Sequence, residues 1–334
     1  MWQCQIGSQG RKRHGNNESA RIVSLQNATT LFSAAPVGTC KLEHHPITEL
    51  IPRDVDEPNN EPPSDEAPPN YRPQLPFNGD AFYISEAMEN VFPEHMFRNN
   101  NVAVITESNP AAVPKLIPVI LHFASVLGPD WPIVLLTLQE NWVLPDSIAF
   151  RQLVDTRRVI IMFLPPDTKF DSHKAVTYFF VRRFFWQLFA PANRILIFQV
   201  DSILCAQSPR KIEEFLEWDF IGAPILKRYG KGYNGGLSIR NPRLMLDIVK
   251  QQEKKPVRLK IEDQWFYERL LERKAHMPSE DVAKTFAVET IFYDKPLGYH
   301  QPSRYQRGAK LKQIAEWCPE VELTAGGPHF YHGP

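Results

Sequence analysis

Residues 195–205 read ILIFQVDSILC, an apolar run that ends in a single carboxylate, Asp201. Apolar runs without polar alternation are typical of strands in a parallel sheet that is covered on both faces. Similar runs occur at 102–106, 133–137 and 159–163, and helical patterns separate them at 113–127 and 174–189. This alternation predicts an α/β domain with a mainly parallel central sheet flanked by helices.

The pattern changes after Asp201. Here the sequence predicts a short helical stretch at 209–217, extended segments at 220–224 and 235–240, and helices at 242–251 and 263–274. We therefore expect a mixed carboxyl-terminal half that is built on the parallel first half.

The chain before the first predicted strand has a different composition. Residues 1–78 show no sustained hydrophobic period, and 52–76 is rich in Pro, Asn, Glu and Asp. We predict a disordered leader and linker over 1–78 and one folded domain over 79–325. No apolar signal-peptide segment stands at 1–20, and arginines and Pro191 interrupt the most apolar stretch, 178–200, so no membrane span is expected.

Charge and cysteine spacing argue against several classes of protein. Lys and Arg total 38, as do Asp and Glu, and the resulting net charge of zero argues against nucleic acid as a partner. The four cysteines lack the C-x-x-C spacing of zinc ribbons and thioredoxin-like sites. Cys205 and Cys318 fall within the predicted domain and could pair in an oxidising compartment, a question that the sequence leaves open.

Asp201 directly follows its strand, and open α/β sheets bind their ligands at the carboxyl ends of strands. A carboxylate there could hold a divalent cation, Mn²⁺ or Mg²⁺, that bridges the diphosphate of a nucleotide sugar. The alternative is a helix N-cap, a position that Asp favours. Thr106 and Glu107 stand at the end of the first strand, and we expect them to contact the donor nucleotide.

The glycines at 230–236 fit two descriptions. Residues 230–235 match G-x-G-x-x-G, but a strand-like run follows them, whereas a dinucleotide fingerprint opens a helix. We interpret the segment as a loop whose glycines let the backbone approach a sugar or diphosphate, with Asn234, Gly235 and Gly236 lining a donor pocket. A plain hairpin turn is the alternative.

Two neighbouring acids, Glu262 and Asp263, precede an amphipathic pattern. Acids in the first turn of a helix are favoured by the helix dipole, which is explanation enough for their presence. A carboxylate can also act as the general base that takes a proton from an attacking hydroxyl.

These segments occur in an order that resembles a known family. The motifs FQVDS, DFIGAP and NGGLS, followed by segments 262–266, 286–289 and 296–300, are similar to a fungal family of glycosyltransferase-like domains of unknown function. The resemblance covers roughly 102–300, and the order and spacing of the pieces are more specific than any one of them.

The resemblance implies a GT-A-like single domain in which an Asp-x-Asp motif ends a strand and binds metal and diphosphate. Here the motif reads Gln199-Val200-Asp201, so only its last acid is present. Gln199, Asp201 and Ser202 are then implied donor contacts, and His300 an implied second metal ligand beside Asp201. An ordinary core or surface histidine is the alternative for His300.

The same resemblance implies that Asp263 is the catalytic base and that Glu262 positions the acceptor. The leading hypothesis is a transferase that moves a sugar from a nucleotide-sugar donor to a hydroxyl of a glycan or glycoconjugate, assisted by a divalent cation. One alternative is a degenerate domain that binds carbohydrate or nucleotide sugar without turnover. A nucleotide-dependent oxidoreductase is the other, although 106–114 contains no glycine. The family suggests the Golgi or secretory pathway.

Overall fold

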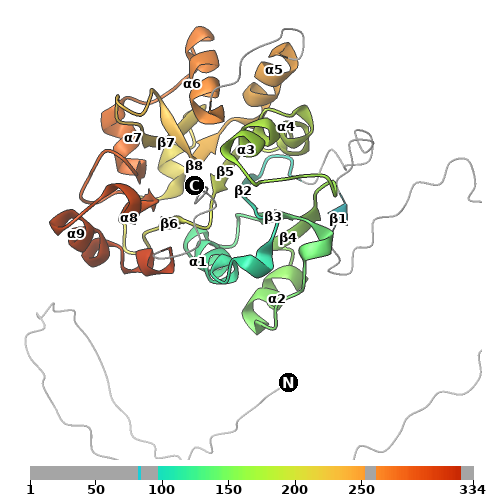
Figure 1. The fold of residues 1–334 in the computed structure, drawn as a ribbon. Coiled ribbons are helices and arrows are strands. Elements are labelled where there is room, and N and C mark those ends of the chain that lie inside the picture. The colour runs from blue at the N-terminus through green and yellow to red at the C-terminus, as the bar shows by residue number, and fades with distance from the viewer. Residues whose placement is uncertain (1–81, 84–96, 253–260, 325–334) are drawn as a thin grey trace, which may run out of the picture. The chain divides into compact units, whose positions relative to one another are not determined.

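The computed structural model describes residues 82–83, 97–252 and 261–324, all within the compact unit Asn70–Pro334. The predicted leader and linker at 1–78 lies outside these residues. The described chain is an α/β fold with a mixed sheet flanked by helices, which confirms the predicted fold class (Figure 1).

The main sheet has seven strands among the described residues, in the order β1-β4-β3-β2-β5-β8-β7. Strands β1 to β5 run parallel, and β8 is antiparallel to both β5 and β7. Their bounds are β1 Phe82–Tyr83, β2 Asn101–Thr106, β3 Ile133–Thr137, β4 Val159–Phe163, β5 Arg194–Phe198, β7 Phe220–Pro224 and β8 Tyr233–Arg240. The side chains of β2 to β5 are buried almost throughout, as expected for strands covered on both faces.

The order of strands reverses between β2 and β5. From β2 the chain moves outward through β3 and β4 and then returns to β5 on the other side of β2. The loops after β2 and β5 therefore leave the sheet in opposite directions, which opens a crevice at their carboxyl ends. Thr106, Glu107 and Asp201 stand at this crevice.

A second, three-stranded sheet in the order β6-β10-β9 lies beside the main one. It consists of β6 Ser202–Leu204, β9 Ala287–Val288 and β10 Gly298–His300. Because β10 is antiparallel to β6, His300 stands opposite Ser202 and next to Asp201. A disulfide between Cys205 and Cys318 ties the end of β6 to the chain after the last helix, so the pairing that the sequence left open is formed.

Nine α-helices fall within the described residues, and none is long and apolar enough to cross a membrane. In the view of Figure 1, α1 and α2 lie below the strands of the main sheet and α3 to α6 lie above them. The bounds are α1 Leu116–Leu127, α2 Ile148–Asp155, α3 His173–Phe180, α4 Arg183–Phe189, α5 Pro242–Gln252, α6 Glu262–Glu272, α7 Glu280–Phe286, α8 Pro302–Tyr305 and α9 Ala309–Trp317. Short 3₁₀ turns occupy Pro110–Ala112, Gln139–Asn141, Ile212–Phe215 and Pro319–Leu323.

The single helix predicted at 174–189 is wrong. The chain forms α3, breaks at 181–182 and starts again as α4. The indole nitrogen of Trp186 donates a hydrogen bond to the carbonyl oxygen of Phe180, which a continuous helix would use for a backbone hydrogen bond. The break also lets both short helices bury their aromatic side chains. Helix α1 likewise begins at Leu116 instead of residue 113.

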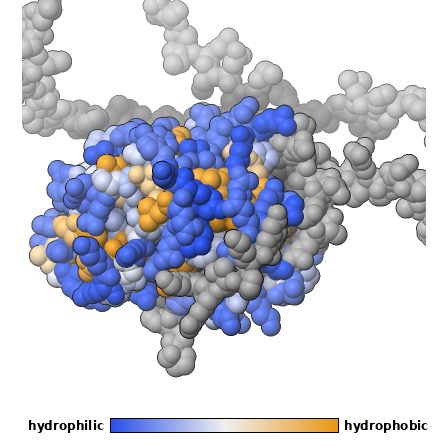
Figure 2. Space-filling model, turned by 90° about the horizontal axis from the view of Figure 1, so that it is seen from above, coloured by the Kyte–Doolittle hydropathy of each residue, from blue (hydrophilic) through white to orange (hydrophobic). Residues whose placement is uncertain are grey.

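On the face shown in Figure 2 the described surface is mostly hydrophilic, and hydrophobic residues form small separate patches. Scattered apolar residues of this kind are normal on a folded domain.

Candidate active site

Two adjoining pockets open at the carboxyl ends of β2 and β5. The small pocket, about 40 Å³, is lined by Thr106, Glu107, Asp201 and apolar side chains that include Phe170 and Phe180. The large pocket, about 410 Å³, is formed mainly by the carboxyl-terminal half. Its polar lining comes from His173, Thr177, Gln199, Tyr229, Asn234, Glu262, Asp263, Gln264, Glu289, Thr290, His300, Gln301, Arg304 and Tyr305. Val176, Phe180 and Gln199 line both pockets, so the two adjoin at these side chains, and together they are called the cleft below.

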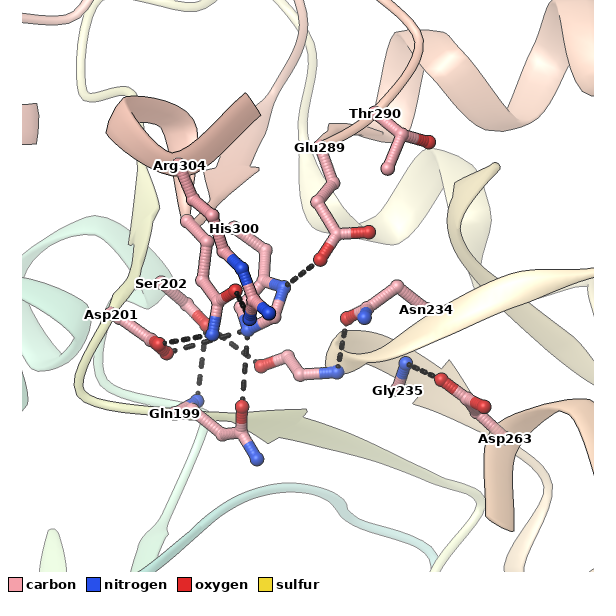
Figure 3. A network of polar contacts seen from close by, with 12 residues as sticks. Gln199, Asp201, Ser202, Asn234, Gly235, Asp263, Glu289, Thr290, His300 and Arg304 are labelled. Carbon is pink, nitrogen blue, oxygen red and sulfur yellow. Dashed lines mark hydrogen bonds and ion pairs between the residues drawn. The ribbon is translucent and has the colours of Figure 1, made fainter. Parts of the chain in front are cut away.

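Three polar atoms converge where the pockets meet (Figure 3). The Nε2 atom of His300 lies 3.1 Å from Oε1 of Gln199 and 3.3 Å from Oδ1 of Asp201. Oδ1 of Asp201 is buried and has no hydrogen-bond partner among the described residues. Two oxygens that only accept hydrogen bonds thus face one ring nitrogen.

The other ring nitrogen of His300 is held by an acid. Nδ1 lies 3.0 Å from Oε1 of Glu289, and both side chains are buried. Burial alone would lower the pKa of His300, but Asp201 and Glu289 outweigh it and together raise that pKa to about 10. Burial would raise the pKa of Asp201, but His300 and a hydrogen bond from Gln301 lower it overall. Because both ring nitrogens face oxygens that accept hydrogen bonds, a proton on Nε2, and with it a positive charge on the ring, is favoured.

The chemistry of these atoms fits a divalent cation as well as a proton. Among the described residues no group of three or more His, Cys, Asp or Glu side chains is arranged as a metal site. The amide oxygen of Gln199 supplies a third donor beside Asp201 and His300. Neighbouring ligands of an octahedral Mg²⁺ lie about 3 Å apart, close to the two separations seen here. Glu289 on Nδ1 is the outer-shell partner that a metal-bound histidine usually has.

A tight turn holds Gln199 and Ser202 against β8. The hydroxyl of Ser202 donates to the carbonyl oxygen of Gly236 at 2.7 Å, and the backbone N–H of Gln199 donates to the same oxygen at 2.9 Å. Ser202 is fully buried and does not line either pocket. Of the residues predicted to contact the donor, Ser202 is the one that the structure places behind the pocket wall.

Asn234, Gly235 and Gly236 lie inside β8 and line the large pocket, whereas Gly230 and Gly232 lie in the connection between the antiparallel strands β7 and β8. Gly230 and Gly232 thus belong to a hairpin, the alternative that the sequence left open, while Asn234, Gly235 and Gly236 stand in a strand instead of a loop. A Cβ atom at Gly236 would collide with His300 and Gln199. Glycine is therefore required there by the cluster itself.

Asp263 lies next to Gly235 in Figure 3, at the first turn of α6. Its Oδ2 accepts a hydrogen bond from the backbone N–H of Gly235 at 3.1 Å, and its side chain lines the large pocket. Burial, assisted by the charge of Glu262, raises the pKa of Asp263 to about 7, against the opposing charge of Arg240. A carboxyl group with that pKa can take up and release a proton near neutral pH.

Glu262 forms an ion pair with Arg240, a partner that the sequence did not identify. Its two carboxylate oxygens accept hydrogen bonds from Nη1 and Nη2 of Arg240 at 2.8 and 3.0 Å. Arg240 is fully buried, and its Nε donates to the hydroxyl of Ser238. The acceptor-positioning role predicted for Glu262 must therefore compete with this internal ion pair.

Glu107 is an acid of the small pocket, which Asp201 also lines. One carboxylate oxygen accepts a hydrogen bond from the backbone N–H of Asn109 at 2.7 Å, and the other is buried with no hydrogen-bond partner among the described residues. Burial raises the pKa of Glu107 to about 7, and the hydrogen bond from Asn109 opposes this rise. Thr106, the last residue of β2, lines the same pocket.

Among the polar residues of the site that were not predicted, four bond to the predicted residues directly or through one another: Arg240, Glu289, Gln301 and Arg304. Glu289 follows β9, and Gln301 and Arg304 follow β10. Glu289 closes segment 286–289 of the family resemblance, a signal that could have identified it. Arg240 stands two residues after the NGGLS motif, at the end of β8, and carries no local sign of its burial.

A protein-family model described as "Protein of unknown function (DUF5672)" matches residues 158–300. The match includes Asp201, Asp263, Glu289 and His300, and it excludes Thr106 and Arg304. No curated protein matches the sequence.

Several solved glycosyltransferase structures are similar to the chain. Glycosyltransferase GlyE from Streptococcus pneumoniae TIGR4, in its apo form, is 13% identical over 67% of this chain and 64% of that chain, with a TM-score of 0.39. Mannosyltransferase PcManGT from Pyrobaculum calidifontis, in complex with GDP-Man and Mn²⁺, is 11% identical over 56% of each chain, with a TM-score of 0.35. Core-mannan synthase A from Aspergillus fumigatus, in its Mn/GDP form, is 8% identical over 67% of this chain and 86% of that chain, with a TM-score of 0.37. The chain spans less than two thirds of the GlyE and PcManGT chains.

Proposed function

We propose that this GT-A-like domain is a glycosyltransferase that moves a sugar from a nucleotide-sugar donor to a hydroxyl of a glycan or glycoconjugate. The motif order that resembles a fungal glycosyltransferase-like family supports this proposal. The observation that carries it is the cluster of Gln199, Asp201 and His300, which presents acceptor atoms to one point of a cleft that also contains Asp263.

Each part of the cleft has a distinct task in the proposed reaction. Asp201, His300 and Gln199 would hold a divalent cation, which when bound neutralises charge on the leaving diphosphate. Asn234, Gly235 and Gly236 line the side of the pocket where the donor sugar lies. Thr106 and Glu107 line the small pocket and would contact the nucleotide beside it, with the oxygen of Glu107 that has no hydrogen-bond partner among the described residues as the acceptor.

Asp263 acts as the general base. Its carboxylate takes the proton of the acceptor hydroxyl while the bond from the sugar to the diphosphate breaks. The backbone N–H of Gly235 holds Oδ2 and leaves Oδ1 with a hydrogen bond only to its own helix, at 2.6 Å from the backbone nitrogen of Gln264. The carboxylate is thereby kept at the wall of the large pocket.

Hydrolysis and binding of a panel of nucleotide sugars, with and without Mn²⁺, test the proposal. Asp201→Ala is the test variant, and Asp294→Ala, at an exposed acid, is its matched control. We expect one donor to be turned over by the native and control proteins with Mn²⁺ and not by Asp201→Ala. A native protein that binds no nucleotide sugar under any condition contradicts the proposal.

Gln199 favours a second candidate, a degenerate domain that binds nucleotide sugar without turnover, because an amide supplies less charge to a cation than the acid of an Asp-x-Asp motif. Gln199→Glu separates the two candidates. If the native domain is a transferase, the variant binds Mn²⁺ more tightly and both proteins transfer sugar. If only the variant, or neither protein, shows turnover while both bind the donor, the degenerate domain is the correct description.

A further inference from the structure

The charges of the cleft do not balance. Acids at 107, 201, 262, 263 and 289 line the two pockets, and Arg304 is the single Lys or Arg among the described lining residues. Glu262 is neutralised internally by Arg240, but a nucleoside diphosphate brings at least two further negative charges into the same space. Positive charge must therefore come from the cation cluster and from Arg304.

We infer that Arg304 binds the diphosphate of the donor and that Gln301 holds its guanidinium in place for this purpose. This inference rests on the proposed transferase function. In the reaction, the bond between the anomeric carbon and the phosphate oxygen breaks, and its electron pair leaves with the nucleoside diphosphate. The acceptor oxygen forms the new bond to carbon and its proton passes to Asp263. Arg304 stabilises the charge that develops on the departing phosphate.

Gln301 can hold Arg304 in only one way. Its Nε2 donates a hydrogen bond to Oδ2 of Asp201 at 2.7 Å, and because a carboxylate only accepts, the amide nitrogen must face Asp201. The amide oxygen therefore faces the other way, where it accepts a hydrogen bond from Nη1 of Arg304 at 2.8 Å. The cation cluster and the arginine are thus joined through one amide group.

The backbone of Gln301 is also unusual. Gln301 is buried and has φ of 45°, in the left-handed region that side-chain-bearing residues rarely adopt. Its N–H donates to the carbonyl oxygen of Asp201 at 3.0 Å. Backbone strain of this kind persists where the surroundings determine it, and it gathers at ligand clamps. Here the strained residue bridges Asp201 and Arg304.

The guanidinium keeps donors for a ligand. Arginine has five N–H donors in a planar fork that matches phosphate oxygens, and within the described part of the chain its hydrogen bond to Gln301 leaves most of them for a ligand. The group lies over the ring of Tyr305, 5.2 Å from its centre, which restricts it to one side. Figure 3 shows Arg304 directed toward His300 and the cluster. His173, the other basic side chain at this wall, has its pKa lowered by burial and by the charge of Arg304.

Binding of nucleoside diphosphates and of the matching nucleosides, in EDTA and in Mn²⁺, tests the inference. The variants are Arg304→Gln, which removes charge and fork, and Arg304→Lys, which keeps the charge alone. Arg307→Gln is the matched control, because Arg307 is an exposed arginine three residues away that bonds only backbone carbonyl oxygens. UDP and GDP are the probes, with uridine and guanosine as their controls.

We expect Arg304→Gln to weaken diphosphate binding about 10- to 100-fold, the range for a charge-assisted hydrogen bond, and to leave nucleoside binding unchanged. The loss of affinity is larger in EDTA than in Mn²⁺. The affinity of Arg304→Lys lies between those of the native protein and Arg304→Gln, and Arg307→Gln binds as the native protein does. Native-like diphosphate binding by Arg304→Gln in both conditions overturns the inference alone. A native protein that binds neither diphosphate overturns the proposed function as well.

Discussion

Two buried charge clusters lie beside the cleft, and they differ in how completely their atoms are paired. In the first, Arg240 and Glu262 use both carboxylate oxygens and both terminal guanidinium nitrogens on one another. In the second, His300 lies between Asp201 and Glu289, and Oδ1 of Asp201 stands 3.3 Å from Nε2 of His300 but accepts no hydrogen bond from the described residues. We interpret the fully paired cluster as part of the fold, and we propose that the incompletely paired one faces a ligand.

Asp263 marks the boundary between the two clusters. Consecutive residues of a helix point about 100° apart, so Glu262 and Asp263 cannot face the same partner. Glu262 meets Arg240 in the protein interior, while Asp263 reaches Gly235 at the pocket wall. Neighbouring acids in the sequence therefore belong to different clusters, and variants of each should have different consequences.

The largest effect is expected from breaking the paired cluster. Arg240→Met leaves Glu262 buried without its partner and should lower the free energy of unfolding by about 3–5 kcal/mol, measured by urea denaturation. The double variant Arg240→Met, Glu262→Met should recover most of this loss, because a buried pair can be replaced by apolar side chains. A double variant that is stable but transfers no sugar would show that Glu262 positions the acceptor and does not serve only as the ion-pair partner of Arg240.

Asp263→Asn should produce the next largest effect, on rate and not on folding. Loss of a general base lowers the rate of transfer by about 10²- to 10⁴-fold. Donor binding, measured by calorimetry, should remain as in the native protein. Asp281→Asn is the matched control, since Asp281 is an exposed acid in the first turn of α7. Equal rates for the two variants would remove Asp263 from the proposed reaction.

A smaller effect should follow from a change behind the incompletely paired cluster. Glu289→Gln keeps the shape of the side chain but removes the charge that faces Nδ1 of His300. Loss of such an outer-shell partner weakens metal binding by about 10- to 100-fold. Titration of Mn²⁺ in the presence of a nucleoside diphosphate measures this change, with Glu280→Gln, at an exposed acid, as the control. Unchanged Mn²⁺ affinity in Glu289→Gln would place the cation elsewhere.

The smallest change is expected in the pH profile. The pKa of Asp263 is raised to about 7, and the base must be deprotonated, so kcat/KM should rise with pH through about 7 and fall roughly tenfold per unit below it. Glu107 has a similarly raised pKa, and Glu107→Gln should keep this limb if Asp263 causes it. A profile that is flat from pH 5 to 8 contradicts the assignment.

The same raised pKa values make the stability of the protein depend on pH. Between about pH 4 and 7 the folded protein binds protons on Asp263 and Glu107 that the unfolded chain has released. Stability contributed by these groups is therefore lost as the pH rises through that window. Urea denaturation of Asp263→Asn should show a weaker pH dependence than that of the native protein.

Local pattern predicted the parallel half of the fold well. Each of β2 to β5 is built on an apolar run that is visible in the sequence. Because Asp201 directly follows one of these runs, its place at the carboxyl ends of the strands could be predicted from sequence alone. Strands of two or three residues such as β6, β9 and β10 carry too little periodicity to be recognised. The sheet that brings His300 to Asp201 was therefore invisible, although the resemblance to a family named both residues.

The remaining site residues depend on long-range contacts. Gln301 reaches Asp201 across 100 positions of sequence, and Arg240 meets Glu262 across 22. No composition or spacing signals that an arginine is fully buried or that an amide bridges two charged groups. Such roles follow only from geometry, which is why Arg304 and Gln301 were absent from the sequence-based predictions.

The disulfide closes a covalent ring of chain that contains most of the site residues. Cys205 and Cys318 are 113 positions apart, and Asn234, Asp263, Glu289 and His300 all lie between them. A crosslink that closes a loop of this length lowers the conformational entropy of the unfolded chain, which raises the free energy of unfolding by about 5 kcal/mol. During synthesis the ring cannot close until residue 318 has left the ribosome, so the site is locked only after nearly the whole domain has been made. Where thiols are kept reduced, that lock is absent, and the site must be held by noncovalent contacts alone.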